Sequence, residues 1–216
     1  MRGILIGLGL ALAATAASAQ TQQQQHDWCF GPTATDDQTI DGCTAVIQSE
    51  QESQANKAAA YDNRGFAYRQ KGQYDQAIAD ENQSLAMEPN SSNTYNNRGE
   101  DYDDKGLYDA AIADYTRSIA LKPNTDSAYG NSGNAFAYNN RGLAYVHKGL
   151  YAQAVVDYSQ AIALKPDYAK AFENRGGAYE KQGSRDQAIA DYRAALRLDP
   201  NRQNATSGLT RLGVTP

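Results

Sequence analysis

The fold is decided by Tyr95-Asn96-Asn97-Arg98-Gly99, a short stretch that recurs along the chain. Its other copies begin at Tyr61, Tyr138 and Phe172, so that successive copies lie 34, 43 and 34 residues apart. A second block follows each copy, at Ala77–Asp80, Ala111–Asp114, Ala154–Asp157 and Ala188–Asp191. Each unit then closes with a proline: Pro89, Pro123, Pro166 and Pro200. Four units in phase indicate a repeat architecture.

Each unit predicts two antiparallel helices. A glycine such as Gly99 lies inside the first helix, where it costs about 1 kcal/mol relative to alanine, so its recurrence indicates a close helix–helix approach. A Lys-Gly step, here Lys105 and Gly106, ends that helix because glycine takes the left-handed cap conformation. The small Ala111 lets the second helix cross the first, and the proline stops the second helix. Such a pair cannot bury its apolar face alone, so the units must stack.

In these residues the chain resembles the tetratricopeptide repeat family, over roughly residues 58–201. The resemblance implies an all-α fold, a right-handed superhelix of antiparallel helix pairs with a capping helix at each end. It also implies that the first helices of the units line a concave face, which is where such proteins bind other proteins.

The expected organisation follows the repeat period. The four repeats cover residues 58–91, 92–124, 135–168 and 169–202, and an insert covers residues 125–134. An N-terminal capping helix or degenerate half repeat occupies residues 36–57, and a C-terminal capping helix and tail occupy residues 203–216. Before them come a signal peptide over residues 1–19 and, over residues 20–35, a flexible linker with a loop that carries Cys29.

Each unit carries an arginine where the family commonly has leucine, and an aspartate sixteen residues further on. We expect each arginine to pair with the aspartate of its own unit: Arg64 with Asp80, Arg98 with Asp114, Arg141 with Asp157, and Arg175 with Asp191. The alternative is a solvated arginine whose stem covers apolar surface. Either arrangement is structural rather than catalytic.

The first residues predict export. Arg2 precedes an apolar run from Ile4 to Ala14, and Ala17-Ser18-Ala19 has the small-x-small pattern that signal peptidase reads. We expect cleavage after Ala19 and a periplasmic or secreted protein. An uncleaved membrane anchor is the alternative, although crossing a bilayer takes about 20 apolar residues.

The two cysteines, Cys29 and Cys43, predict one disulfide, because an exported protein meets an oxidising compartment. The bond closes a loop of about 15 residues, worth about 3 kcal/mol. It staples the loop around Trp28 over the open end of the repeat stack. Two free buried thiols are the alternative; a metal site fits poorly because His26 and His147 lack ligand spacing to the cysteines.

Composition excludes some classes of function. The 216 residues include 20 basic and 25 acidic side chains, a net charge of −5 that argues against binding to nucleic acid phosphates. Fifteen tyrosines suit helices whose rings are buried while the hydroxyl reaches a polar edge. The sequence has no Gly-x-Ser-x-Gly elbow and no phosphate-cradling glycine loop, and only two histidines. We therefore expect no enzyme activity, no cofactor and no metal.

The predicted concave face carries an asparagine at one position of every first helix: Asn63, Asn97, Asn140 and Asn174. An amide both donates and accepts hydrogen bonds, so this row can hold an extended peptide backbone. The alternative is that the asparagines satisfy contacts between helices. The resemblance also implies a basic clamp for a C-terminal carboxylate, but Asp62, Phe66 and Phe136 stand among the positions that would form it. An acidic C-terminal tail is therefore not the expected ligand.

An acidic run marks the first helix of the second unit. Glu100, Asp103 and Asp104 form it together with Asp101, which replaces a small residue expected at a packing position. One interpretation is a solvated face, and the other is a negative patch that selects a basic segment of a partner. Calcium is a weak candidate because carboxylates on one regular helix cannot wrap an ion as a loop does.

The 43-residue offset adds nine residues between the second and third units. Gly130, Ser132 and Gly133 favour a loop there. That loop is either a tolerated surface bulge or a functional element that reaches over the groove with Phe136.

The sequence thus predicts a non-catalytic interaction scaffold of the periplasm or cell exterior. Its expected partner is another protein, bound through an extended or basic segment in the concave groove. A cell-wall or polysaccharide-associated protein, with tyrosines stacked on sugars, is the alternative.

Overall fold

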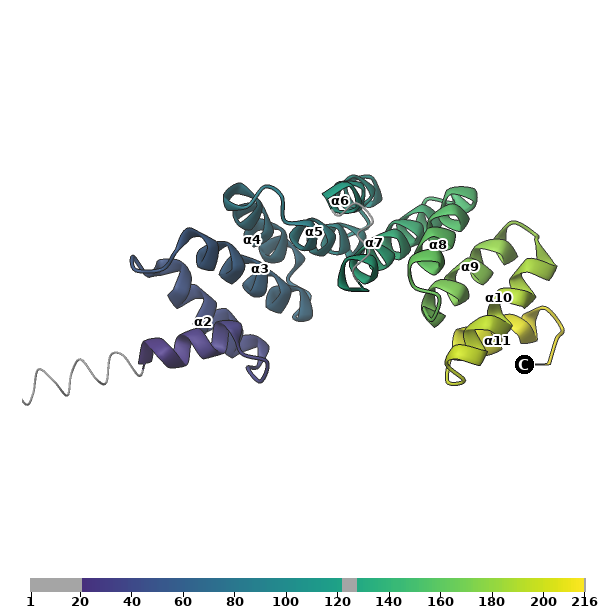
Figure 1. Cartoon of the computed structure of the whole chain (residues 1–216), viewed down its shortest axis with the longest axis horizontal. Helices are drawn as coiled ribbons and strands as arrows, with labels where there is room; N and C mark the ends of the chain where they lie inside the picture. The colour runs from purple at the N-terminus through teal and green to yellow at the C-terminus, as the bar shows by residue number, and fades with distance from the viewer. Residues whose placement is uncertain (1–20, 122–127, 216) are drawn as a thin grey trace, which may run out of the picture. The chain divides into compact units, whose positions relative to one another are not determined.

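The computed structural model describes residues 21–121 and 128–215, and in that part of the chain all regular structure is helical (Figure 1). The chain forms two compact units, Met1–Pro89 and Asn90–Pro216. None of the described helices is long and apolar enough to cross a membrane. The expected signal peptide, residues 1–19, lies outside the described residues.

Unit 1 contains a helix over residues 21–30, followed by α2 (Asp36–Gln48), α3 (Gln54–Gln70) and α4 (Tyr74–Met87). Helix α3 packs against both α2 and α4. Thr35 and Gln38 form a reciprocal capping box at the start of α2, and the Ser53 hydroxyl accepts from the Asn56 amide at the start of α3. Gly72, at φ 70°, makes the turn between α3 and α4, as the Lys-Gly step predicts.

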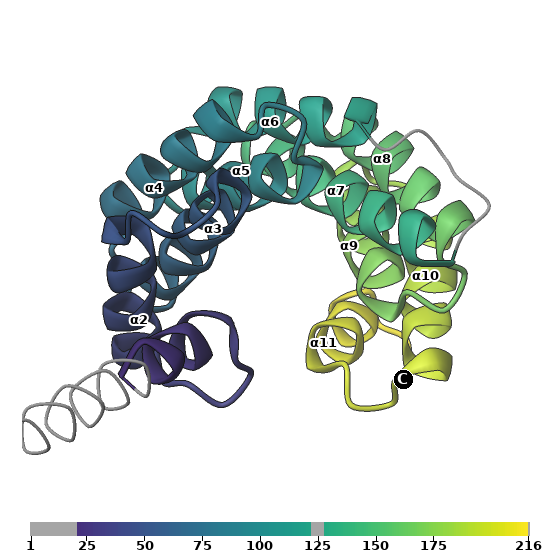
Figure 2. The same ribbon diagram turned by 60° about the vertical axis from the view of Figure 1, so that its left-hand side comes forward.

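Unit 2 contains seven described helices in two alternating layers (Figure 2). The first helices of its repeats are α5 (Ser92–Asp104), α7 (Ala128–His147) and α9 (Ala169–Lys181), and α11 (Gln203–Arg211) continues their layer. The second helices are α6 (Tyr108–Leu121), α8 (Tyr151–Leu164) and α10 (Arg185–Leu198). Neighbours in the first layer contact one another. The side of this layer that points away from α6, α8 and α10 is called the first-helix face below.

The predicted arginine–aspartate pairs are all present in the structure. In each repeat the arginine Nε lies 2.7 Å from Oδ2 of the aspartate, and Nη2 donates to Oδ1: Arg64–Asp80, Arg98–Asp114, Arg141–Asp157 and Arg175–Asp191. The aspartates are buried, and this two-point geometry offsets the cost of desolvating both charges. The hydrogen bond to aspartate raises the pKa of each arginine above its usual value.

Each arginine also ties its repeat to further groups. Its guanidinium lies 5.4 to 6.0 Å from two aromatic rings of its own helix, three residues before it and four after it. Arg141 Nη1 donates to the Thr116 hydroxyl of α6, and Arg175 Nη1 to the Ser159 hydroxyl of α8. In unit 1, Arg64 donates to Thr44 of α2 in the same way. Arg64, Arg141 and Arg175 therefore connect successive helix pairs as well as the two helices of their own repeats.

The recurring glycine has a physical cause in unit 2. A Cβ placed on Gly99 or Gly142 would lie 2.7 Å from the ring of Tyr115 or Tyr158, and one on Gly176 would lie 3.0 Å from Tyr192. These tyrosines, at most 2% exposed, fill the space between the two helices of a repeat. The close approach inferred from the sequence is therefore an approach of ring to backbone.

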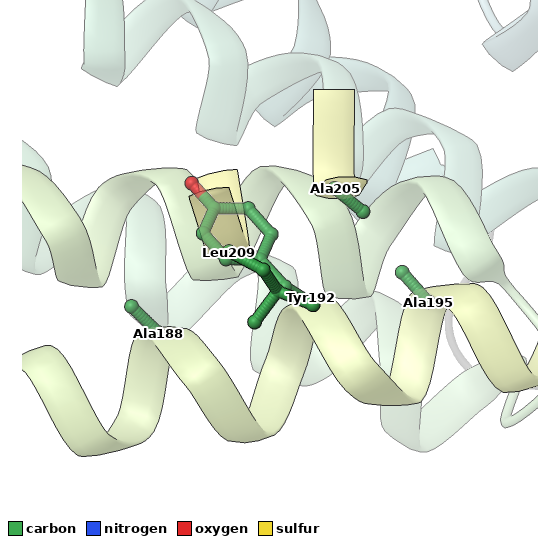
Figure 3. Packing of buried hydrophobic residues seen from close by; sticks show 5 residues of the cluster. All are labelled: Ala188, Tyr192, Ala195, Ala205 and Leu209. Carbon is green, nitrogen blue, oxygen red and sulfur yellow. The ribbon is translucent and has the colours of Figure 1, made fainter. Parts of the chain in front are cut away.

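The last repeat is closed by α11. Tyr192 packs with Ala188, Ala195, Ala205 and Leu209 in one buried cluster (Figure 3). A Cβ on Gly208 of α11 would overlap the other side of the Tyr192 ring. The ring is thus held between two glycine-bearing helices, and α11 has the capping role that the sequence predicts.

The prediction of a flexible linker and a Cys29 loop over residues 20–35 was wrong for residues 21–30, which are helical. Glutamine is a good helix former, so a segment without an apolar face can still be helical once it is docked. It docks at Gly42 of α2, where an added Cβ would lie 2.5 Å from the Gln25 carbonyl oxygen. The disulfide between Cys29 and Cys43, with the Cα atoms 4.5 Å apart, fastens the same contact.

The prediction of a loop in the insert was also wrong where the structure describes it. Residues 128–134 belong to α7, a helix of 20 residues, and Gly130 and Gly133 lie inside it. Each glycine costs a helix about 1 kcal/mol, but this stretch continues directly into a repeat helix anchored by buried Asn134 and Ala135. Residues 125–127 of the expected insert lie outside the described residues.

Candidate partner-binding face

The asparagine row joins neighbouring first helices. Asn140 Nδ2 on α7 donates to Glu100 Oε1 on α5 at 2.7 Å and to Asn96 Oδ1 at 3.4 Å. Asn174 Nδ2 on α9 donates to Asn139 Oδ1 on α7 at 2.9 Å. Asn97 lies half-buried on α5. These bonds favour the structural interpretation of the row, in which the amides satisfy contacts between helices.

Asn63 has a capping role in unit 1. Its Nδ2 donates to the Cys29 carbonyl oxygen at 3.0 Å. That carbonyl belongs to the last turn of the helix over residues 21–30, where no further helical amide can reach it. The first member of the row therefore helps to hold the N-terminal helix in place.

Two further asparagines, Asn96 and Asn139, take part in the network, and sequence reasoning missed both. Each stands one residue before a member of the predicted row, so the pair of adjacent asparagines was the available signal. Asn139 is fully buried, and its Nδ2 donates to Asn140 Oδ1 at 3.3 Å. Two successive helix positions thus supply the interface instead of one.

The residues of the acidic run lie in different environments. Glu100 Oε1 accepts from the amides of Asn96, at 3.0 Å, and of Asn140. Both of these donors are neutral amides, and the two bonds orient the carboxylate. Asp101 is fully buried, whereas Asp104 is exposed.

Asp103 faces His147 at the end of α7. Its Oδ1 lies 3.2 Å from Nδ1 of His147, whose ring packs at 4.8 Å from that of Tyr108. Burial raises the pKa of Asp103, and the contact with His147 opposes that shift. The run is therefore not one uniform solvated face. Among residues 21–121 and 128–215 there is no group of three metal-ligating side chains.

An aromatic pair lies beside this network. Phe136 stands one helical turn before Asn140, so both side chains share one face of α7. Its ring is 43% exposed and meets Tyr168, at the start of α9, edge to face with centroids 5.2 Å apart. Burial, and then the charge of Glu100, raise the pKa of Tyr168 to about 12. Glu100, Phe136 and Tyr168 therefore belong to one neighbourhood.

The acidic residues of α9 are matched by arginines at α11. Arg202 contacts Glu173 through two nitrogens, at 2.8 and 3.0 Å, and Arg211 contacts Glu180 through two, both at 2.9 Å. The Tyr192 hydroxyl donates to Glu180 as well. The hydrogen bond from Arg211 is the main cause that lowers the pKa of Glu180. Sequence reasoning missed both pairs, which join α9 to the two ends of α11.

Comparison with protein families matches this architecture. Family models described as tetratricopeptide repeat match residues 58–91, 92–125 and 169–202, and one described as TPR repeat matches residues 142–183. Together they cover more than half of the chain, which belongs to the tetratricopeptide repeat family. No curated protein is matched by the sequence.

Solved structures show the same fold. The chain is 26% identical to the protein in "Crystal structure of MamA", with 78% of this chain and 91% of that one covered and a TM-score of 0.64. It is 28% identical to the "Arabidopsis OM64 TPR domain", with 57% and 94% covered and a TM-score of 0.51. It is 30% identical to the protein in "First TPR of Spaghetti (RPAP3) bound to HSP90 peptide SRMEEVD", with 56% of this chain and 90% of that one covered and a TM-score of 0.50.

Proposed function

We propose that the chain is a non-catalytic scaffold that binds an extended segment of another protein along the first-helix face of unit 2. The observation that carries this proposal is Phe136, a large apolar ring that is 43% exposed beside the hydrogen-bonded side chains of Asn140 and Glu100. One similar solved structure holds a peptide of another protein, SRMEEVD. That peptide ends in acidic residues, whereas the face here carries Glu100 and Asp103, so the two proteins select different segments.

Export is the second part of the proposal. The Cys29–Cys43 disulfide supports a periplasmic or extracellular location, because such bonds persist in oxidising compartments. The apolar run and the small-x-small pattern before Gln20 support it from the sequence.

The polysaccharide alternative needs tyrosine rings that are open to sugars. In the third repeat, three of the described tyrosines instead pack within the repeat. Tyr138 and Tyr145 lie against Arg141, and Tyr158 is buried against Gly142.

Site-specific photo-crosslinking in intact cells tests the proposal. A photoreactive phenylalanine analogue at position 136 or 143 stands on the first-helix face, seven residues apart on α7. Matched positions 156 and 163 stand seven apart on the exposed side of α8. We expect crosslinks to a discrete protein from the α7 positions only, on a chain whose N-terminus is Gln20 by mass spectrometry. Equal crosslinking from α8, or none from α7, would contradict the binding role; a retained leader would contradict cleavage after Ala19.

A further inference from the structure

A pocket of about 580 Å³ lies in unit 1 between the helix over residues 21–30 and the start of α2. Small-molecule sites occupy about 300–1,000 Å³, so it has room for a small molecule or a short stretch of a polymer. We call it the Trp28 pocket. The aromatic and polar side chains that line it are Trp28, Gln23, Gln24, Asp27, Thr33 and Gln38.

Helical spacing places the lining residues of the N-terminal helix on one side. Gln24 lies one helical turn before Trp28. Gln23 lies one turn before Asp27 in the same way. A Cβ on Gly42 of α2 would lie 2.7 Å from the Cβ of Trp28, and the residue after Trp28 forms the disulfide to α2. The tryptophan is therefore anchored at the contact that holds this helix to α2.

Local hydrogen bonds orient two of the polar groups in the Trp28 pocket. Gln23 Nε2 donates to Asp27 Oδ1 at 2.8 Å. Gln38 Oε1 accepts from the Thr35 amide nitrogen at 3.0 Å in the capping box of α2, so its Nε2 is the donor that a ligand would meet. The pocket thus combines amides, a hydroxyl and one carboxylate with one half-buried aromatic ring.

This combination of groups suits a sugar. A pyranose ring has apolar C–H groups on its faces, which stack on a large aromatic ring such as Trp28. The hydroxyls around its edge both donate and accept hydrogen bonds, as do the side chains of glutamine and threonine. Asp27 accepts from a hydroxyl but repels the carboxylate of an acidic sugar, so it favours a neutral one.

Beyond the binding of a protein segment by unit 2, we propose that the Trp28 pocket of unit 1 binds a neutral pyranose unit of a glycan. The ring of Trp28 covers one face of the sugar. Gln24, Gln38 and Asp27 bond to its hydroxyls. This site uses the N-terminal helix and α2, and it does not need the repeat tyrosines.

Trp28 is the only tryptophan of the chain, so its fluorescence reports the pocket directly. The oxidised protein is titrated with cellotriose and chitotriose as neutral trisaccharides, with trigalacturonate as the acidic one and with mannitol as an acyclic polyol. We expect a saturable change of emission with a neutral trisaccharide, a weaker one with trigalacturonate and none with mannitol. No saturable change with either neutral trisaccharide, or an equal response to mannitol, would overturn the proposal.

Two exposed glutamines of the N-terminal helix provide a matched pair of variants. Gln24 lines the Trp28 pocket, whereas Gln22 lines a different one. Gln24→Ala should weaken the bound trisaccharide about two- to tenfold, the effect of one lost hydrogen bond, and Gln22→Ala should not. In Trp28→Ala, saturation-transfer NMR of the sugar should show loss of binding while the helical content is retained. Equal effects of the two glutamine variants, or full binding in Trp28→Ala, would refute this assignment.

Discussion

The two ends of the repeat array are closed by different chemistry. In unit 1 the helix over residues 21–30 is bound to α2 by the Cys29–Cys43 disulfide and by close packing at Gly42. In unit 2 helix α11 is bound by two arginine–glutamate contacts and by Leu209, which is fully buried. The N-terminal helix is therefore held by a covalent bond, and α11 is held by ion pairs and apolar packing.

The apolar surface available to each end explains this difference. A terminal helix has only one neighbouring layer to pack against, so its own buried face must hold it. The N-terminal helix is rich in glutamine, and of its residues only Cys29 is fully buried. Helix α11 buries Ala205, Gly208 and Leu209 around Tyr192. A helix with little apolar surface needs the covalent bond, whereas α11 adds ion pairs to an existing apolar contact.

The largest expected effect on stability comes from removing the Cys29–Cys43 disulfide. Replacing both cysteines, as Cys29→Ser with Cys43→Ser, should lower the free energy of unfolding of unit 1 by about 3 kcal/mol, the value for a loop of this length. Trp28 is the only tryptophan and lies on the helix concerned, so its fluorescence reports that helix directly.

Urea titration followed by Trp28 emission measures this effect, and reduction of the native protein provides the same change without mutation. The NMR signals of Leu209 should keep their midpoint, because α11 does not use the disulfide. An unchanged Trp28 midpoint after reduction would show that packing at Gly42 alone holds the helix.

A smaller loss of stability is expected when Gly42 or Gly208 is replaced by alanine. Gly42→Ala puts a methyl group against the backbone carbonyl of Gln25, which cannot move aside without moving its helix. Gly208→Ala puts one against the ring of Tyr192. Overpacking of this kind costs about 1–3 kcal/mol, with the backbone contact at the upper end.

The exposed neighbours Asp41→Ala and Ser207→Ala are the matched controls, since they change the same helices without a clash. Urea unfolding compares each glycine variant with its neighbour. If Gly42→Ala is no more costly than Asp41→Ala, the N-terminal helix does not depend on close packing.

The repeats were predictable from the sequence, and the ends were not. The sixteen-residue spacing of Arg98 and Asp114 places them across one helix pair, so their contact follows from the period alone. The helix over residues 21–30 has no apolar period, and its order comes from Gly42 and Cys43 in another helix. For Asn140 the sequence predicted the helix but not the direction of its amide, because that depends on Glu100 of the neighbouring repeat.

The smallest expected effect is the loss of stability at acidic pH from the contact between Glu180 and Arg211 of α11. The pKa of Glu180 is lowered in the folded protein, first by the hydrogen bond from Arg211. A lowered folded pKa contributes stability that is present above the unfolded pKa, near 4.3, and is lost as the pH falls through the folded value. Arg211 is more than half exposed, so the contribution is about 0.5 kcal/mol and should decrease further in concentrated salt.

The methyl resonances of Leu209 report this contact, because Leu209 packs beside Tyr192, whose hydroxyl donates to Glu180. Between pH 6 and pH 3 their chemical shifts should change in the native protein and change less in Arg211→Met, where the largest cause of the lowered Glu180 pKa is absent. Trp28 emission should stay constant over the same range and in high salt, because a disulfide does not titrate there. A matching acid response at Trp28 would mean that both ends depend on charge, and the contrast between a covalent and an ionic end would fail.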